Sequence, residues 1–201
     1  MSTSIPIHNR TYETQAFVEP DGSIRLVGRL VDTKPHGLAL ADGEPLIIHD
    51  MTVELVLDGD TFEIRDIRPI MDVHPYEQCT GILDAYEQLI GTSIARGYSR
   101  RIKELFGGPG GCSHIGALLI AMGPTVVQAS WGRAKMHDDL EEMATRDTLD
   151  PAEVERQMRL NENTCHVWKS DGAKIAFLRK GERPIEPDWV TERLTKLGVI
   201  D

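Results

Sequence analysis

The sequence predicts an α+β protein, in which an N-terminal antiparallel β-meander of about five strands packs against C-terminal helices. Over about the first 75 residues, apolar and polar side chains alternate with period two, which is typical of half-buried strands. After Pro75, apolar side chains recur at three- and four-residue spacing, which is typical of helices. The 201 residues suit a single domain over 1–201, β-rich at about 10–75 and mainly helical at 76–201.

Turn sequences separate the expected strands. Residues 12–18 and 23–32 flank Pro20-Asp21-Gly22, so we expect them to form a hairpin. A long alternating run follows at Leu46–Leu57, and Asp58-Gly59-Asp60 then turns the chain into a further strand over 62–71. The N-terminal part is therefore expected to be a meander of sequential hairpins.

The first helices are expected beyond Pro75. Apolar residues at helical spacing over 79–90 predict a helix that ends at Gly91, and a shorter helix should cover Tyr98–Phe106. From Ser113 to Met122 the sequence is apolar on nearly every side, which predicts a buried helix. Gly123-Pro124 should kink or interrupt this helix before residues 126–131.

The C-terminal third carries clearer start and stop signals. Asp150 is a good N-cap residue and Pro151 suits the first helical position, which predicts a helix over about 151–160. A last amphipathic helix should lie between Asp188 and Gly198. Between these helices we expect a small hairpin near 164–178, because two short runs flank Asp171-Gly172.

Charge and composition exclude several classes of partner. A net charge of −10 repels phosphate backbones, so we expect no nucleic-acid partner. No apolar run approaches the roughly 20 residues that span a bilayer, and the N-terminus lacks the order of a secretory signal, so we expect no membrane partner and a cytoplasmic location. Three cysteines are an odd number, and a reducing compartment would keep them as thiols.

The glycine-rich segment from Gly107 to His114 is the strongest candidate site. Its four glycines allow the backbone to approach a ligand just before a buried helix begins, and a helix N-terminus favours an anion or a developing oxyanion. Cys112 is thus a candidate thiolate and His114 a candidate acid or base, with Gly110 and Gly111 beside the substrate. The alternative is a flexible loop that leads to a core cysteine and a capping histidine.

His49 and Asp72 are further candidate catalytic residues. The alternation that points Met51 inward also points His49 inward, and a core-facing histidine must be hydrogen-bonded, ligating or catalytic. Asp72 stands where the chain leaves the sheet for the first helix. A satisfied structural role for His49 and a turn-forming role for Asp72 are the alternatives.

Substrate-binding candidates lie in three other places. Aromatic and cationic side chains can bind a phenol or a carboxylate, although a solvated helix face explains an arginine equally well. In the segment 163–168, Cys165 and His166 would point to opposite faces of a strand, so they cannot both line one pocket. The full set of substrate-binding candidates is Gly110, Gly111, Tyr86, Arg101, His166 and Trp168.

A bound metal is not expected, and zinc is the alternative. Zinc accepts four cysteine or histidine ligands, but the chain has no Cys-x-x-Cys pair and no histidine pair at helical spacing. Cys79 shares its face with Ile82 and Leu83, which favours a buried thiol. If a metal is bound, the ligands we would expect are Cys79, Cys112, His114 and His49.

The order of these motifs resembles the bacterial domain-of-unknown-function family 2889. The resemblance rests on His49-x-Met51, Asp72, Cys79, Tyr86-x-x-Leu89-x-Gly91 and Gly110-Gly111-Cys112-Ser113-His114, and it runs from about residue 12 to residue 168. It implies a site that contains His49, Asp72, Cys79, Cys112 and His114. It also implies a role in bacterial catabolism of aromatic compounds, where related sequences are associated with formaldehyde-releasing lyases.

The leading functional hypothesis is therefore a cofactor-independent lyase that acts on a bulky phenolic molecule and releases formaldehyde from its hydroxymethyl side chain by acid–base catalysis. One alternative is an acyl-transfer or hydrolytic enzyme in which Cys112 is the nucleophile. Another is a non-enzymatic protein that binds a small molecule or a structural metal. The expected partner is an aromatic small molecule, and a homodimer is compatible with the sequence.

Overall fold

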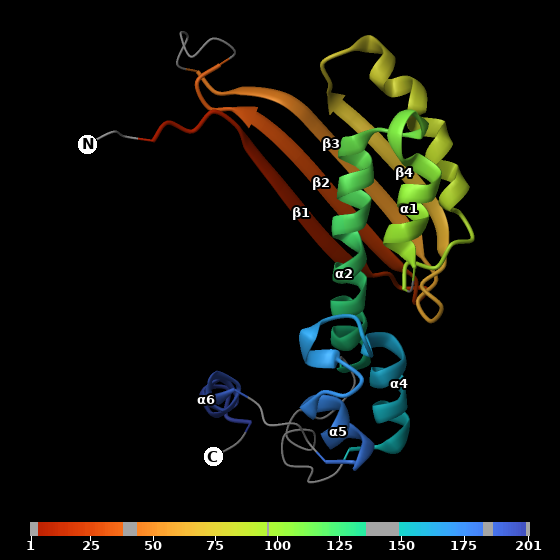
Figure 1. Cartoon of the computed structure of the whole chain (residues 1–201), viewed down its shortest axis with the longest axis vertical. Coiled ribbons are helices and arrows are strands. Elements are labelled where there is room, and N and C mark those ends of the chain that lie inside the picture. The colour runs from red at the N-terminus through yellow and green to blue at the C-terminus, as the bar shows by residue number, and fades with distance from the viewer. Residues whose placement is uncertain (1–3, 38–43, 96, 136–148, 183–186, 200–201) are drawn as a thin grey trace. The chain divides into compact units, whose positions relative to one another are not determined.

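The computed structural model describes residues 4–37, 44–95, 97–135, 149–182 and 187–199 (Figure 1). The chain divides into two compact units, Met1–Ser130 and Trp131–Asp201, and each is described by itself. Within the described ranges, no helix combines the length and the apolar character needed to cross a membrane.

The first unit is built on a four-stranded antiparallel meander (Figure 1). The sheet order β1-β2-β3-β4 follows the sequence, which confirms the α+β class and the predicted hairpins. The expected count of about five strands is wrong, because the alternating sequence forms four long strands of ten to twelve residues each. The strands are β1 (Asn9–Val18), β2 (Ile24–Lys34), β3 (Leu46–Leu57) and β4 (Ile64–Val73).

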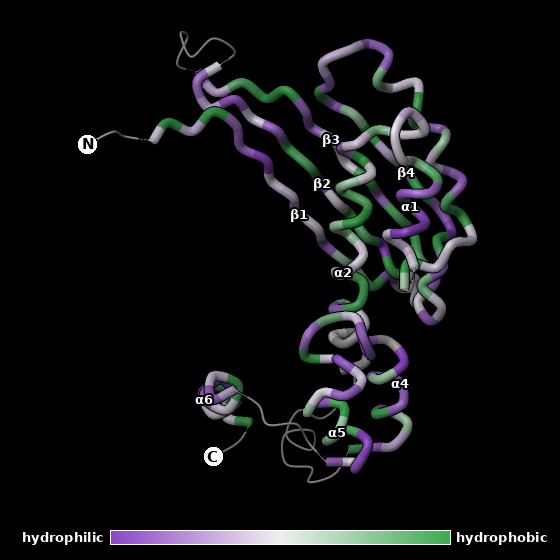
Figure 2. Tube along the Cα trace, in the orientation of Figure 1, coloured by the Kyte–Doolittle hydropathy of each residue, from purple (hydrophilic) through white to green (hydrophobic). Residues whose placement is uncertain are grey.

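One face of this sheet packs against helices to form the core. Leu26, Leu30 and Leu55 on the sheet are fully buried, together with Leu118 on the helix α2 (Ser113–Lys135). Figure 2 shows the corresponding alternation of hydrophobic and hydrophilic residues along the strands. The helix comes closest at Gly28, where a Cβ atom would lie 2.6 Å from the Met122 sulfur. The apolar face of β2 thus points into this core.

The segment after the sheet is a 3₁₀ helix, η1 (Glu77–Leu89), rather than an α-helix. Its inward side chains Leu83, Tyr86 and Leu89 are three residues apart, which matches the three residues per turn of a 3₁₀ helix. Gly91, with a φ of 84°, follows this helix at the position where the sequence predicts its end.

Two further helices follow η1 in the first unit. The helix α1 (Tyr98–Phe106) has the predicted bounds, and a short turn η2 (Gly108–Gly110) leads to α2. The helix α2 continues through Pro124, so the predicted interruption is wrong, while the alternative of a kink stays a prediction. Pro124 lies on the exposed side of α2, where water can satisfy the carbonyl that loses its hydrogen bond, while Met122 and Val126 stay buried on either side.

The second unit contains short helices around a small core. The helix α4 (Pro151–Asn161) begins as predicted, and the Asp150 side chain accepts a hydrogen bond from the Ala152 amide. The predicted hairpin near 164–178 is wrong, because Gly172 directly precedes a helix whose apolar side chains Ile175 and Leu178 share one core with Trp168. The remaining elements are η3 (His166–Trp168), α5 (Ala173–Arg179) and α6 (Asp188–Lys196).

Candidate functional site

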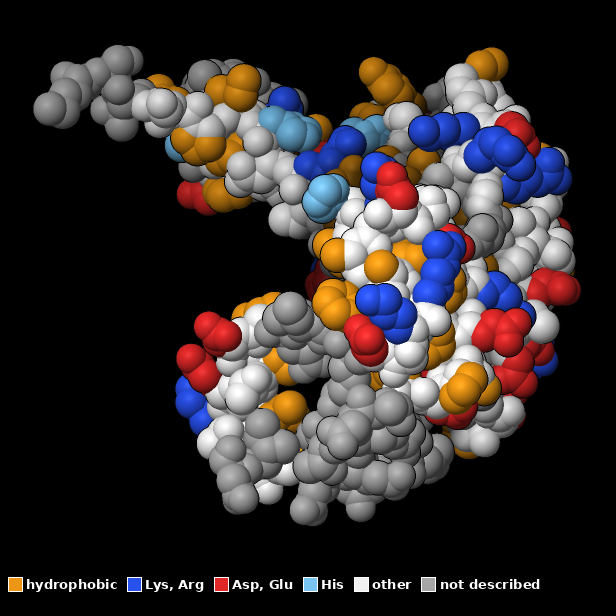
Figure 3. All heavy atoms as spheres, turned by 60° about the horizontal axis from the view of Figure 1, so that its bottom comes forward, with side chains coloured by type: hydrophobic (Ala, Val, Ile, Leu, Met, Phe, Trp, Pro, Cys, Tyr) orange, Lys and Arg blue, Asp and Glu red, His pale blue; other side chains and the backbone are white. Residues whose placement is uncertain are grey.

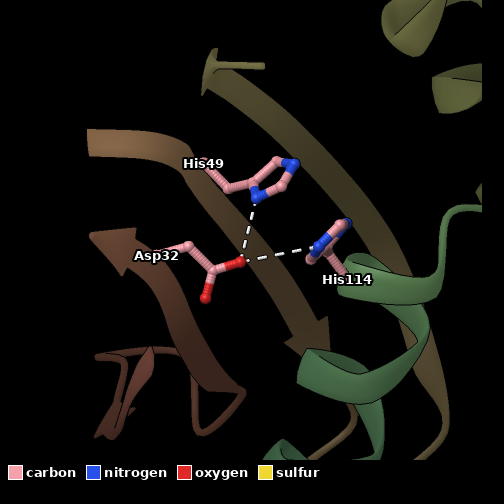
Figure 4. A group of neighbouring side chains, drawn as sticks. All are labelled: Asp32, His49 and His114. Carbon is pink, nitrogen blue, oxygen red and sulfur yellow. Dashed lines mark hydrogen bonds and ion pairs between the residues drawn. The ribbon is translucent and has the colours of Figure 1, made fainter. Parts of the chain in front are cut away.

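Three polar residues stand directly opposite one another on neighbouring strands. Arg10 on β1 pairs with Asp32 on β2, and Asp32 pairs with His49 on β3. Since cross-strand partners project from the same face of a sheet, the register alone brings their side chains together. His114, in the first turn of α2, joins this row from above the sheet, and Figure 4 shows both imidazoles directed at the Asp32 carboxylate.

The carboxylate of Asp32 is the centre of the cluster. Its side chain is fully buried, and Arg10 donates from Nε to Oδ1 at 2.6 Å and from Nη2 to Oδ2 at 2.7 Å. His49 Nδ1 lies 2.9 Å from Oδ2, His114 Nε2 lies 3.5 Å from Oδ2, and His8 Nε2 lies 3.2 Å from Oδ1. The Arg10 hydrogen bonds hold the pKa of Asp32 well below its usual range, although burial opposes them. Asp32 is therefore ionised.

The two imidazoles of His49 and His114 form a stacked pair. Their ring centroids are 3.8 Å apart and their planes are inclined by 33°. Burial lowers the pKa of His114, and the neighbouring His49 and Arg10 lower it further, so His114 is a neutral imidazole at neutral pH. Because an ionised carboxylate only accepts hydrogen bonds, Nδ1 of His49 carries a proton and its Nε2 keeps a free lone pair when the ring is neutral. For His114, the tautomer that carries its proton on Nε2, the nitrogen nearer Asp32, leaves Nδ1 as the acceptor.

Cys112 lies at the other nitrogen of His114. Its sulfur is 3.7 Å from His114 Nδ1. The Cys112 amide donates to the Tyr86 hydroxyl at 2.8 Å, and that hydroxyl donates to the Cys112 carbonyl at 3.3 Å. Burial raises the pKa of Tyr86 to about 12, which keeps the hydroxyl protonated and able to donate. Tyr86 thus fixes the backbone that precedes His114.

The glycines of the loop are explained largely by packing against α1. At Gly111, a Cβ atom would lie 2.5 Å from the Phe106 Cβ atom and 2.7 Å from its carbonyl oxygen. At Gly110, a Cβ atom would lie 3.1 Å from the Leu105 carbonyl oxygen. The absence of side chains at these positions lets the loop turn tightly at the end of α1, and this places Cys112 and His114.

The structure brings only some of the predicted site residues to this cluster. His49, His114 and Cys112 converge, whereas Asp72 is exposed near the end of β4 and Arg101 is exposed on α1 beside Glu104. Cys79 packs against the core of the first unit. In the second unit, the predicted substrate-binding residues are an exposed His166 and a buried Trp168.

Sequence reasoning missed Asp32, Arg10 and His8. A signal for Asp32 was present, because it continues the inward series of Leu26 and Leu30 on β2, where a charged residue is unexpected. The turn between β1 and β2 also sets a register in which Arg10 faces Asp32. His8 precedes β1, and no pattern in the sequence points to it.

The cluster is open to solvent at one edge. The side chains of Arg10 and His8 are 34% and 35% exposed, and Figure 3 shows histidine side chains close to lysine and arginine side chains on one face. Two large apolar side chains are also exposed, namely Ile7, which precedes His8, and Ile47, which lies two residues before His49. Tyr12, two residues after Arg10 on β1, is 44% exposed. The His49 and His114 side chains are 13% and 21% exposed, so solvent reaches both histidines.

The cluster also has the donor types of a divalent cation site. Asp32, His49 and His114 each offer one ligand atom, and these three atoms lie within 4.8 Å of one another. This set differs from the predicted one, since it uses a carboxylate and no thiol. Arg10, however, already occupies both oxygens of Asp32 and offsets its charge, so a cation would lie beside a guanidinium. The arrangement therefore suits proton transfer better than cation binding.

Comparison with known protein families gives a match over most of the first unit. Residues 8–128 match a family model described as "Protein of unknown function (DUF2889)". No match was found among curated proteins or among solved structures. The matched range contains every residue of the cluster from His8 to His114.

Proposed function

The chain belongs to the DUF2889 family, which carries no assigned activity, and from its histidine pair we propose that it is a lyase that acts on an aromatic small molecule by acid–base catalysis. The substrate we propose is a phenolic dimer of the lignin type that carries a hydroxymethyl side chain. The products are formaldehyde and the shortened dimer, and the setting is the catabolism of aromatic compounds.

The observation that carries this proposal is the stacked pair of His49 and His114 on one ionised carboxylate. Two imidazoles within one site can remove protons from two places on a substrate that binds across them. Each has a ring nitrogen that faces away from Asp32 and is an acceptor in the neutral ring. Acid–base catalysis needs groups of this kind within hydrogen-bond range of the reacting atoms.

In the proposed reaction, one histidine takes the proton of the substrate's phenol group. The phenolate then expels the benzylic ether oxygen as that carbon–oxygen bond breaks, which gives a quinone-methide-like intermediate and a second phenolate. The other histidine takes the proton of the hydroxymethyl group. The carbon–oxygen bond of the hydroxymethyl group becomes a double bond as formaldehyde leaves, and the electron pair of the broken carbon–carbon bond passes into the quinone-methide system and restores the aromatic phenolate. The two phenolate oxygens of the product then take back the two protons from the histidines. The electrons balance without an external oxidant or reductant, so the reaction needs no redox cofactor.

Asp32 and Arg10 assist this chemistry without contacting the substrate: Asp32 contacts the histidines, and Arg10 contacts Asp32. A carboxylate hydrogen-bonded to an imidazole holds the ring in one orientation and stabilises the imidazolium that forms when the ring accepts a proton. The double hydrogen bond from Arg10 keeps Asp32 ionised, so the carboxylate does not take the proton itself. Asp32 and Arg10 are positioning residues in this proposal.

The test is direct. The purified full-length chain is treated with a chelator and incubated with a phenylcoumaran-type dimer, and formaldehyde release is measured. We expect release by the wild type and a loss of at least about a hundredfold in His49→Ala and in His114→Ala. His74→Ala is the matched control, because His74 is half-buried outside the cluster and its Nδ1 contacts the carbonyl of Tyr76. A wild-type chain that releases no formaldehyde, with or without added metal, rules the proposal out.

A further inference from the structure

One nucleophilic side chain lies next to the acid–base pair and has no part in the proposed reaction. The Cys112 sulfur is 3.7 Å from Nδ1 of His114, while Nε2 of the same ring is 3.5 Å from Asp32. Thiol, imidazole and carboxylate thus follow one another in the order of a nucleophile, its base and the group that orients the base. This order is the one that activates a thiol.

The position of Cys112 is fixed from two sides. Tyr86 holds both its amide and its carbonyl, and Gly111 packs the preceding backbone against Phe106. The thiol itself is only partly buried, so a small electrophile can reach it. The other two cysteines provide natural comparisons, because Cys79 packs against the core and Cys165 is exposed.

We propose that Cys112 is a nucleophilic thiol that adds reversibly to the carbonyl carbon of a small aldehyde, with His114 carrying the proton. The choice of aldehyde rests on the proposed function, whose product is formaldehyde. The thiol proton moves to Nδ1 of His114, and the sulfur forms a bond to the carbonyl carbon. The electron pair of the carbonyl double bond passes to the oxygen, which then takes the proton from His114. The product is a hemithioacetal, and nothing is oxidised or reduced.

The adduct has a consequence for the proposed lyase. A hydroxymethyl group on the Cys112 sulfur lies beside the ring nitrogen that His114 uses to accept a proton. While the adduct is present, the oxygen of this group competes with the substrate for that nitrogen. Accumulating formaldehyde therefore slows the enzyme, and removing formaldehyde restores it.

The experiment measures alkylation of each cysteine in the full-length chain by iodoacetamide at neutral pH, using peptide mass mapping. We expect Cys112 to react about tenfold faster than Cys165, although it is less exposed, because His114 accepts its proton. In urea the difference should disappear. In His114→Gln the rate at Cys112 should fall to that of Cys165 or below, whereas His74→Ala should leave it unchanged.

Formaldehyde is then added as the probe. We expect it to protect Cys112 from alkylation and to leave Cys165 unprotected, and gel filtration that removes formaldehyde should restore the reaction. Equal rates at Cys112 and Cys165 in the folded wild type, or no selective protection by formaldehyde, overturn the inference. These outcomes do not depend on turnover, so a chain that is protected at Cys112 but releases no formaldehyde from the dimer refutes the lyase alone.

Discussion

The imidazole rings of His49 and His114 lie 3.8 Å apart, and both face the same oxygen of Asp32. One ring comes from a strand and the other from the first turn of α2. Their distance is therefore set by how α2 packs on the sheet, and their protonation is set by a shared carboxylate. This coupling makes the cluster sensitive both to a change of charge and to a change of packing.

The Asp32→Asn variant should lose about 2–3 kcal/mol of unfolding free energy, because Arg10 then loses its ionic partner beside a fully buried side chain. This loss is smaller than that expected for a fully buried ion pair, because the Arg10 side chain is about a third exposed and water can solvate its charge. Asp50→Asn is the matched control. Its partner Arg29 is half exposed, so this variant should cost less than about 1 kcal/mol. Urea denaturation at pH 7 measures both, and equal losses would contradict the role assigned to burial.

Stability should fall on acidification below about pH 6.5. The folded state lowers the pKa of His114 from its ordinary value of 6.5, so the unfolded chain binds more protons as the pH falls through that value. Asp32, whose folded pKa is also lowered, adds a second loss at more acidic pH, below its ordinary value of 3.8. Urea denaturation between pH 5 and 8 should show a smaller slope in His114→Gln than in the wild type. A wild-type curve that rises on acidification in this range would contradict the sign.

Two buried tyrosines should respond in opposite ways to loss of the hydroxyl group. The Tyr98 hydroxyl is buried and has no hydrogen-bond partner among the described residues, so Tyr98→Phe should be neutral or stabilise the fold by up to about 1 kcal/mol. Tyr86→Phe should destabilise it by about 1–2 kcal/mol, because the amide and carbonyl of Cys112 lose their shared partner. Thermal and urea unfolding of both variants test this contrast.

Two glycines test the packing of α2 on the sheet. Gly28→Ala should destabilise the fold by about 1–3 kcal/mol, because the added methyl group would overlap the Met122 side chain. Gly116→Ala within α2 has room for a methyl group, which would lie 4.0 Å from Ile102, and it should stabilise the helix by up to about 1 kcal/mol. A Gly28→Ala variant as stable as the wild type would contradict the close contact between Gly28 of β2 and Met122 of α2.

Chelation should leave the protein unchanged. Because Arg10 occupies both oxygens of Asp32, we expect prolonged treatment with a chelator to alter neither the unfolding temperature nor formaldehyde release. Elemental analysis before and after treatment shows whether any metal was removed. A metal lost in stoichiometric amount together with stability or activity would support a cation site at Asp32, His49 and His114 instead.

The sequence predicted the parts of the site that depend on local pattern. His49 follows from the alternation of β3, and His114 follows from its place at the start of an apolar helix, because both signals lie within a few neighbouring residues. Asp32 was missed because its importance depends on pairing with residues on two other strands. Asp72 was placed in the site from its position at a turn, yet turn position does not determine which face a side chain joins.

For the fold, as for the site, the sequence predicts the features that depend on local pattern and misses those that depend on packing. Period-two and helical spacing located most elements, whereas the 3₁₀ form of η1 and the continuity of α2 through Pro124 depend on packing and solvent exposure. The segment 164–178 was assigned to a hairpin because Asp-Gly favours turns. The same pair can also precede a helix. Here the helix forms because it buries Ile175 and Leu178 in the small core around Trp168.

The row of Arg10, Asp32 and His49 crosses three strands, and a register irregularity between β2 and β3 falls directly beside it, at Asp32 and Thr33. A slip of one residue in either hairpin would send one of these side chains to the opposite face of the sheet. Such a molecule could keep most of its secondary structure and still lack the histidine pair on its carboxylate. The proposed lyase activity would then report correct strand alignment more sensitively than circular dichroism does. A residue inserted in the turn at Asp21 should abolish that activity and leave the circular dichroism spectrum largely unchanged.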